Sequence, residues 1–182
     1  MPPYRYSTLS HGAEGIRLLR ILPHKDKAAP IQCELINYSL EEADETHLYE
    51  ALSYVWGDSS ETLPISVDRQ DFNVTVNLHG ALLRLRSSQL ERIIWIDAIC
   101  INQTDNSEKE RQIKLMAKIY GHANRVNVWL GNAADYSDQA FEDISAAAGS
   151  KGRHLPKKRH SAILKLLNRQ WFRRIWVRRG SQ

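Results

Sequence analysis

The chain has 182 residues, of which 42% are hydrophobic and 25% charged, and its formal net charge is +4 at pH 7. This composition is typical of a folded domain and excludes an intrinsically disordered chain, and the sequence shows no bilayer-spanning apolar stretch and no signal-peptide pattern. The two cysteines, Cys33 and Cys100, lie far apart, which argues against a disulfide framework and indicates a reducing, intracellular location that we expect to be the cytoplasm.

The first part of the chain predicts β-strands. Residues 16–22 and 31–36 are apolar runs separated by a polar loop, and this pattern predicts an N-terminal β-hairpin. Residues 49–58 are rich in β-prone side chains and close on a Gly-Asp turn. We therefore expect an inner strand of a sheet in this stretch.

A second hairpin and a helix are predicted next. The short apolar runs at 65–67 and 72–74 flank a polar turn, which is typical of a small β-hairpin. Apolar residues then recur at helical spacing over 78–85, and Asn77 stands where a helix N-cap is expected.

The segment 92–103 is an apolar run that ends in polar side chains. The run predicts a strand covered on both faces. Its polar residues are Asp97, Cys100, Asn102 and Gln103. Because ligands of open α/β sheets bind beyond the carboxyl ends of the strands, these residues are candidates for a site. The alternative is that Asp97 and Asn102 form an ordinary turn, and the segment taken alone favours this alternative.

A helix and a further strand follow. Ser107 and Glu110 have the spacing of a capping box, and Gly121 is placed to end the helix. The expected inward face of this helix consists of Ile113, Met116, Ala117 and Tyr120. Residues 125–131 predict the next strand, so the order is strand, helix, strand, which implies parallel pairing of the two strands.

The remainder of the chain predicts two more helices, over 133–148 and 161–167. Together these elements predict an α/β fold with a mostly parallel central sheet and flanking helices, plus the N-terminal β-hairpin. The chain is long enough for one such domain.

Several motifs, in order along the chain, resemble the fungal heterokaryon incompatibility (HET) domain. They include Tyr-Glu-Ala-Leu-Ser-Tyr-Val-Trp-Gly-Asp at 49–58, Trp-Ile-Asp-Ala-Ile-Cys-Ile-Asn-Gln at 95–103, Val-Trp-Leu-Gly at 128–131 and Trp-Phe-Arg-Arg-Ile-Trp-Val at 171–177. The resemblance implies an N-terminal tail over 1–15 and a HET domain over 16–177, with its core at 49–131. Residues 178–182 do not follow the family pattern, so we expect a C-terminally truncated member of the family.

The resemblance implies a function and a fold. HET proteins act in fungal non-self recognition that leads to programmed cell death. The family has been suggested to be distantly related to Toll/interleukin-1 receptor (TIR) domains, which implies a TIR-like or flavodoxin-like sheet. Some TIR domains cleave NAD and others act only by assembling with partners.

The residue at the position of the expected catalytic acid indicates which of these two activities to expect. The family motif Trp-Val-x-Gln-Glu is matched by Trp176 and Val177, but Arg179 replaces the glutamine and Gly180 replaces the glutamate. That glutamate would stabilise an oxocarbenium-like sugar cation, which neither glycine nor arginine can do. We therefore expect mainly an interaction and signalling module. The alternative is a TIR-like NAD-cleaving hydrolase, whose activity in this chain the replacement at Gly180 puts in question.

The resemblance implies a set of pocket residues for the case in which the domain binds a nucleotide. The candidate pocket residues are Tyr54, Trp56, Gly57, Asp58 and Asn102. NAD would be a substrate, and no cofactor is otherwise implied. Asp97 and Asp58 are the carboxylates that could act in catalysis, although the favoured alternative is that each bonds within its own loop. No metal is expected, because no histidine or cysteine has metal-ligand spacing.

Charge is distributed unevenly along the chain. Residues 1–150 carry 14 basic and 21 acidic side chains, a net of −7, whereas residues 151–182 carry 11 basic and no acidic ones. This basic tail could meet nucleic acid or an anionic membrane surface, but its Lys-Lys-Arg cluster at 157–159 is short and a solvated face is favoured. The expected partners are other proteins or a second copy of the chain.

Overall fold

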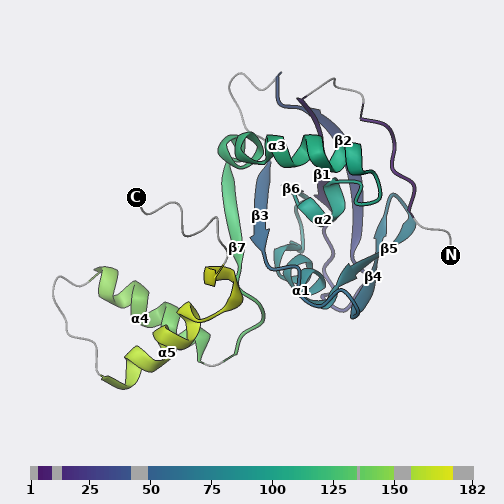
Figure 1. Cartoon of the computed structure of the whole chain (residues 1–182). Coiled ribbons are helices and arrows are strands. Elements are labelled where there is room, and N and C mark those ends of the chain that lie inside the picture. Colours follow the sequence, from purple (N-terminus) through teal and green to yellow (C-terminus); the bar gives the residue numbers. More distant parts are fainter. Residues whose placement is uncertain (1–3, 10–13, 42–48, 135, 150–156, 174–182) are drawn as a thin grey trace. The chain divides into compact units, whose positions relative to one another are not determined.

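A computed structural model describes residues 4–9, 14–41, 49–134, 136–149 and 157–173 (Figure 1). The chain divides into two compact units, residues 1–129 and 130–182, and each is described by itself. The expected non-family end at 178–182, the motif residues 176–180 and most of the acidic stretch after Leu40 lie outside the described residues.

The first unit contains a sheet of seven strands in the order β5-β4-β2-β1-β6-β3-β7. The strands are β1 (Gly15–Ile21), β2 (Gln32–Ser39), β3 (Glu50–Tyr54), β4 (Thr62–Val67), β5 (Gln70–Thr75), β6 (Arg92–Trp95) and β7 (Arg125–Trp129). Both predicted hairpins are confirmed, since β1 pairs with β2 and β4 pairs with β5 in antiparallel register.

The prediction of a mostly parallel sheet is wrong. The pairs β1–β2, β1–β6 and β4–β5 are antiparallel, and they include more residues than the parallel pairs β2–β4, β3–β6 and β3–β7. The physical reason lies in β1, in which all residues except Arg20 are buried. A strand whose side chains are buried on both faces lies in the interior of a sheet and not at its exposed edge, and the N-terminal hairpin accordingly enters the centre of this sheet.

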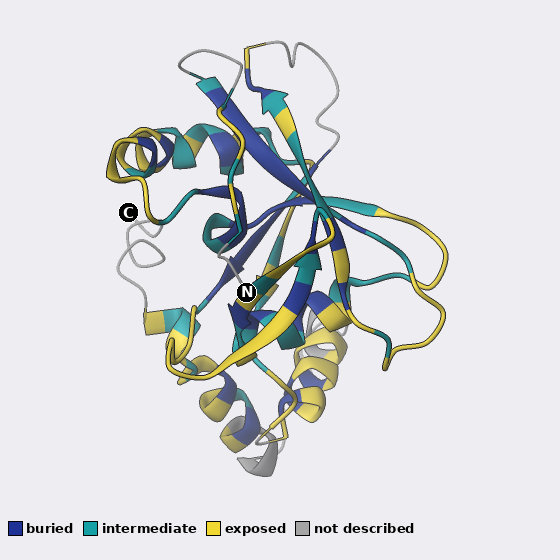
Figure 2. Ribbon diagram, turned by 90° about the vertical axis from the view of Figure 1, so that its right-hand side faces the viewer, coloured by how far each residue is buried: buried dark blue, intermediate teal, exposed yellow. Residues whose placement is uncertain are grey.

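The two strands of the strand–helix–strand unit, β6 and β7, run in the same direction as predicted, but they do not pair with each other. Strands β6 and β7 both run parallel to β3, which lies between them. The sheet is therefore mixed, with a parallel portion formed by β6, β3 and β7. Burial is concentrated along the central strands (Figure 2).

Three helices accompany this sheet: α1 (Val76–Leu85), α2 (Asp97–Cys100) and α3 (Asn106–His122). Helix α1 is capped by Thr75, whose hydroxyl accepts from Leu78 N, and not by Asn77 as predicted. Helix α3 is capped by Asp105, and not by Ser107 as predicted.

The predicted inward face of α3 is wrong in part. Ile113 is 55% exposed, whereas Glu108 and Gln112 are buried. The polar residues turn inward because they have partners there: Glu108 pairs with Arg17, and Gln112 donates to the Gly15 carbonyl at 2.8 Å. Apolar spacing alone cannot reveal such buried polar contacts. The helix also continues one residue past Gly121, to His122.

The second unit contains α4 (Ser137–Gly149), α5 (Lys157–Leu167) and a 3-10 helix at Gln170–Arg173. The two predicted C-terminal helices are thus present. They pack through Ala140, Ala162 and Leu166. Among the described helices of either unit, none is long and apolar enough to cross a membrane.

Candidate functional site

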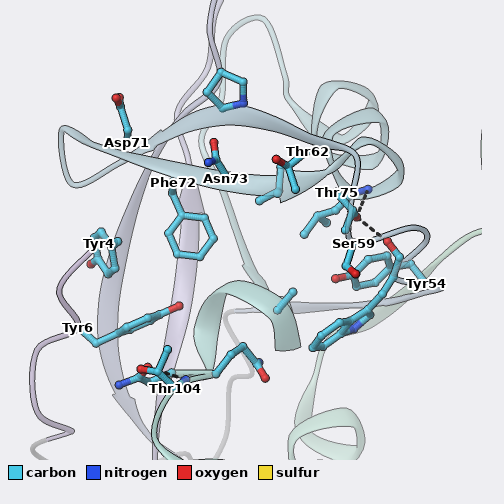
Figure 3. Close-up of a pocket in the computed structure, with 17 residues that line it drawn as sticks. Tyr4, Tyr6, Tyr54, Ser59, Thr62, Asp71, Phe72, Asn73, Thr75 and Thr104 are labelled. Carbon is cyan, nitrogen blue, oxygen red and sulfur yellow. Dashed lines mark hydrogen bonds between the residues drawn. The ribbon is translucent and has the colours of Figure 1, made fainter. Parts of the chain in front are cut away.

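A cavity of about 780 Å³ lies in the first unit beside the β4–β5 hairpin (Figure 3). Its walls come from four segments that are distant in the sequence. They are the N-terminal segment with Tyr4 and Tyr6, the end of β3 with Tyr54 and Trp56, the hairpin with Phe72 and Asn73, and the turn after α2 with Asn102, Gln103 and Thr104.

Three aromatic rings form one wall of the cavity. Tyr4 and Tyr6 contact Phe72 edge-on, with ring centroids 5.6 and 6.4 Å apart, and Phe72 points into the cavity (Figure 3). The Tyr4 hydroxyl donates to Asp68, and the Tyr6 hydroxyl donates to the Ile99 carbonyl at 3.0 Å. Burial raises the pKa of both tyrosines, so both hydroxyls stay protonated at physiological pH.

Trp56 also lines the cavity, and its side chain is fixed by a carboxylate. The indole Nε1 donates to Asp97 Oδ2 at 3.0 Å, while Asp97 Oδ1 accepts from Ala98 N at 2.8 Å. The Thr75 hydroxyl donates to the Trp56 carbonyl at 2.5 Å. Trp56 nevertheless remains 40% exposed, so its ring is available to a ligand.

The turn after α2 is held by side-chain hydrogen bonds. Glu108 Oε1 accepts from Asn102 N at 2.7 Å, and Asn102 Oδ1 accepts from the Thr104 hydroxyl at 2.8 Å. Gln103 Nε2 donates to the Asp97 carbonyl at 2.9 Å. These bonds preorganise the amide and hydroxyl groups that face the cavity.

The family model described as heterokaryon incompatibility protein (HET) matches residues 49–179 of the chain, which include the strand and turns that carry Tyr54, Trp56 and Asn102. The chain belongs to the HET family. The resemblance drawn from its motifs is confirmed.

One curated HET protein is similar over most of this chain. The chain is 37% identical over 155 residues to Heterokaryon incompatibility protein 6, OR allele, of Neurospora crassa. The match covers 78% of this chain and 22% of that protein, so the chain spans about a fifth of the length of this relative. No solved structure matches the chain significantly.

The HET fold brings together three of the five predicted pocket residues. Tyr54, Trp56 and Asn102 line the cavity, whereas Gly57 and Asp58 do not. Asp58 lies on an exposed turn, where its Oδ1 accepts from Ser60 N at 2.8 Å and from the Ser60 hydroxyl at 2.7 Å. These two hydrogen bonds lower the Asp58 pKa. Gly57 belongs to the same turn, where its backbone adopts a positive φ of 81°.

The two other reactive candidates have different surroundings. Asp97 does not line the cavity but borders it through Trp56. Cys100 is buried, and burial raises its pKa to about 12, so its thiol is not a nucleophile at neutral pH. Within the described part of the chain, no group of three or more His, Cys, Asp or Glu side chains could hold a metal ion.

Sequence reasoning missed the wall formed by Tyr4, Tyr6 and Phe72. The first two belong to a segment taken as a tail, and Phe72 belongs to a hairpin with no recognised motif. The alternation Tyr-Arg-Tyr at 4–6, which places two aromatic side chains on one side of an extended chain, was the available signal.

The walls of the cavity carry almost no charge. Of the described residues that line it, Asp71 is the only ionisable one besides the tyrosines, and none is a lysine, arginine or histidine. Asp71 and Phe72 point to opposite sides of β5 (Figure 3). The arrangement offers aromatic faces, amides and hydroxyls to a ligand, and no cation to a phosphate.

Proposed function

We propose that this HET domain is an interaction module of fungal non-self recognition, and that its engagement triggers programmed cell death. Membership of the family and the name of the Neurospora crassa relative support the role in incompatibility. The family unit in this proposal spans residues 16–177, with its core at 49–131. The module acts in the cytoplasm, where its two free, buried cysteines stay reduced.

The observation that carries a binding role is the absence of lysine and arginine from the described cavity walls. A dinucleotide brings two phosphates, and proteins usually meet phosphates with arginine or lysine side chains or with a helix N-terminus. The N-terminus of α1, at Thr75, lies at the cavity, but no lysine or arginine among the described lining residues accompanies it. Aromatic faces with a few convergent amides are, in contrast, typical of sites that hold a ligand by apolar contact and a few hydrogen bonds.

A cell-based experiment tests this proposal. We expect expression of the chain in a fungal host to reduce colony formation, and Phe72→Ala to restore it, because Phe72 is a central ring of the cavity wall. The matched control is Ile113→Ala, which changes an exposed apolar residue on α3. Normal growth with a folded, expressed chain would overturn the cell-death role, and equal killing by Phe72→Ala would overturn the role of the cavity.

The second candidate is a TIR-like NAD hydrolase. It is favoured by one relationship, the hydrogen bond of 3.0 Å that places the Asp97 carboxylate beside Trp56 and next to the cavity. In this reading Trp56 stacks on the nicotinamide ring and Asp97 stabilises the sugar cation. NAD consumption that is lost in Asp97→Asn would support it. Consumption only by the double variant Arg179→Gln plus Gly180→Glu would instead indicate a disabled copy of an enzyme.

A further inference from the structure

Two carboxylates lie at the cavity. Asp71 lines it, and Asp97 borders it through its hydrogen bond to Trp56. None of the described lining residues is a lysine, arginine or histidine. His79, which follows the lining residue Leu78, has its pKa lowered by burial and by the positive charge of Arg86, so it does not offset these carboxylates at neutral pH.

Aromatic rings surround the space beside these carboxylates. Tyr54 lies on one side and Phe72, with Tyr4 and Tyr6, on the other (Figure 3), and Trp56 also lines the cavity. The faces of such rings attract cations, and the attraction is larger when the cation leaves water. Arg17 lies 4.9 Å from the Tyr6 ring centroid, so this wall already holds one guanidinium in the folded protein.

One wall of the cavity is also the edge of the sheet. Strand β5 is the terminal strand, and residues 71–75 all line the cavity in succession. Because alternate side chains of a strand point to opposite faces, a run of successive lining residues means that the backbone itself borders the cavity. An edge strand offers unpaired N–H and C=O groups to an additional extended segment.

We propose that the cavity receives the arginine or lysine side chain of a partner protein, presented by an extended segment that runs along β5. This inference rests on the proposed role as an interaction module and specifies the chemistry of its partner. The aromatic rings hold the cationic side chain, Asp71 and Asp97 attract it, and the β5 edge holds the backbone on either side. A cavity of about 780 Å³ leaves room for this backbone beside the side chain.

Twenty labelled nonapeptides, Ser-Thr-Val-Thr-X-Thr-Val-Thr-Ser with each amino acid at X, test the inference by fluorescence anisotropy with the full chain. We expect the arginine and lysine peptides to bind most tightly and the aspartate and glutamate peptides most weakly. Replacing arginine by citrulline, which keeps the shape and removes the charge, should weaken binding about tenfold. Equal binding of the arginine and citrulline peptides, or no binding of any peptide, would overturn the inference.

Variants of the protein test whether the arginine peptide binds in the cavity. Phe72→Ala and, as a second variant, Trp56→Leu should each weaken binding of the arginine peptide by about tenfold, while Ile113→Ala should not change it. Circular dichroism melting confirms that each variant is folded. Unchanged binding by both folded cavity variants would overturn the inference. Cell killing that still depends on Phe72 while no peptide binds would show that the ligand class is wrong and the proposed function right.

Discussion

Arg17 on β1 and Glu108 on α3 form a buried, bidentate ion pair. Arg17 Nη1 lies 2.6 Å from Glu108 Oε1, and Arg17 Nη2 lies 3.1 Å from Oε2. The same carboxylate accepts from Asn102 N, and the guanidinium donates to the carbonyl of Ser7. The pair therefore ties the N-terminal wall of the cavity to the turn that carries Asn102.

The first prediction concerns this pair. Glu108→Gln leaves the guanidinium buried without its counter-ion, and we expect a loss of about 3–5 kcal/mol in the free energy of unfolding, measured by urea denaturation. Glu110→Gln is the control, since Glu110 pairs with Lys114 on the exposed side of the same helix. That variant should change stability by less than about 0.5 kcal/mol. Equal effects of the two variants would mean that burial does not determine the strength of the pair.

A second prediction concerns Gly57. Its φ of 81° is unfavourable for side chains, and an added Cβ would lie 3.2 Å from the Cβ of Asn77. Gly57→Ala should therefore destabilise the protein by about 1–2 kcal/mol in thermal or urea unfolding. Gly121→Ala is the matched control, because Gly121 is helical and its added Cβ would meet nothing within 4 Å. We expect that change to stabilise the protein by up to about 1 kcal/mol, and a loss of stability there would contradict the helical account.

The third prediction concerns the cysteines. Burial raises the pKa of Cys33 and of Cys100 to about 12, so both thiols should react with a disulfide reagent at pH 8 at least about 100-fold more slowly than in the unfolded chain. Fast reaction in the native state would contradict their burial.

The same shifts give a pH dependence of stability. The folded-state pKa lies above the ordinary value of 9.0, so the unfolded chain loses its thiol protons first as the pH rises. The contribution of the thiols is therefore fully present below about pH 9 and declines between about pH 9 and 12. The double variant Cys33→Ala plus Cys100→Ala should lose less stability across this range than the wild type, and an identical pH profile would contradict the assignment.

A fourth prediction concerns Asn77, which joins the turn of Trp56 to β7. Its Nδ2 donates to the Val55 carbonyl at 2.6 Å, and its Oδ1 accepts from Trp129 Nε1 at 2.9 Å. Asn77→Ala should cost about 1–3 kcal/mol of unfolding free energy, because both partners lose their hydrogen bonds. Thr75→Ser, which keeps the capping hydroxyl of α1, should cost less than about 0.5 kcal/mol. A smaller effect of Asn77→Ala than of Thr75→Ser would contradict this bridging role.

Strands and helices of this chain were predictable because their signals are local. The runs that became β1, β2 and β6 are visible as apolar segments, and the hairpin between β4 and β5 follows from its polar turn. The sheet order was not predictable in this way. The order depends on the pairing of β1 with β2 on one side and with β6 on the other. The second of these pairings brings together residues more than 70 positions apart, such as Leu19 and Ile94.

The residues of the candidate site were likewise predictable only where their signals are local in the sequence. Tyr54, Trp56 and Asn102 follow strands or turns with recognisable motifs, and they do line one cavity. The wall of Tyr4, Tyr6 and Phe72 arises from packing between the N-terminal segment and β5, for which the sequence carries no local rule. The burial of the Glu108 side chain likewise depends on its ion pair with Arg17, which is 91 residues away along the chain.

We propose that this HET domain binds a partner and does not consume NAD. The most direct measurement is the loss of NAD over several hours with the purified full chain, beside its Asp97→Asn variant. We expect the NAD concentration to stay constant with both proteins. Consumption of NAD by the wild type that Asp97→Asn abolishes would contradict it.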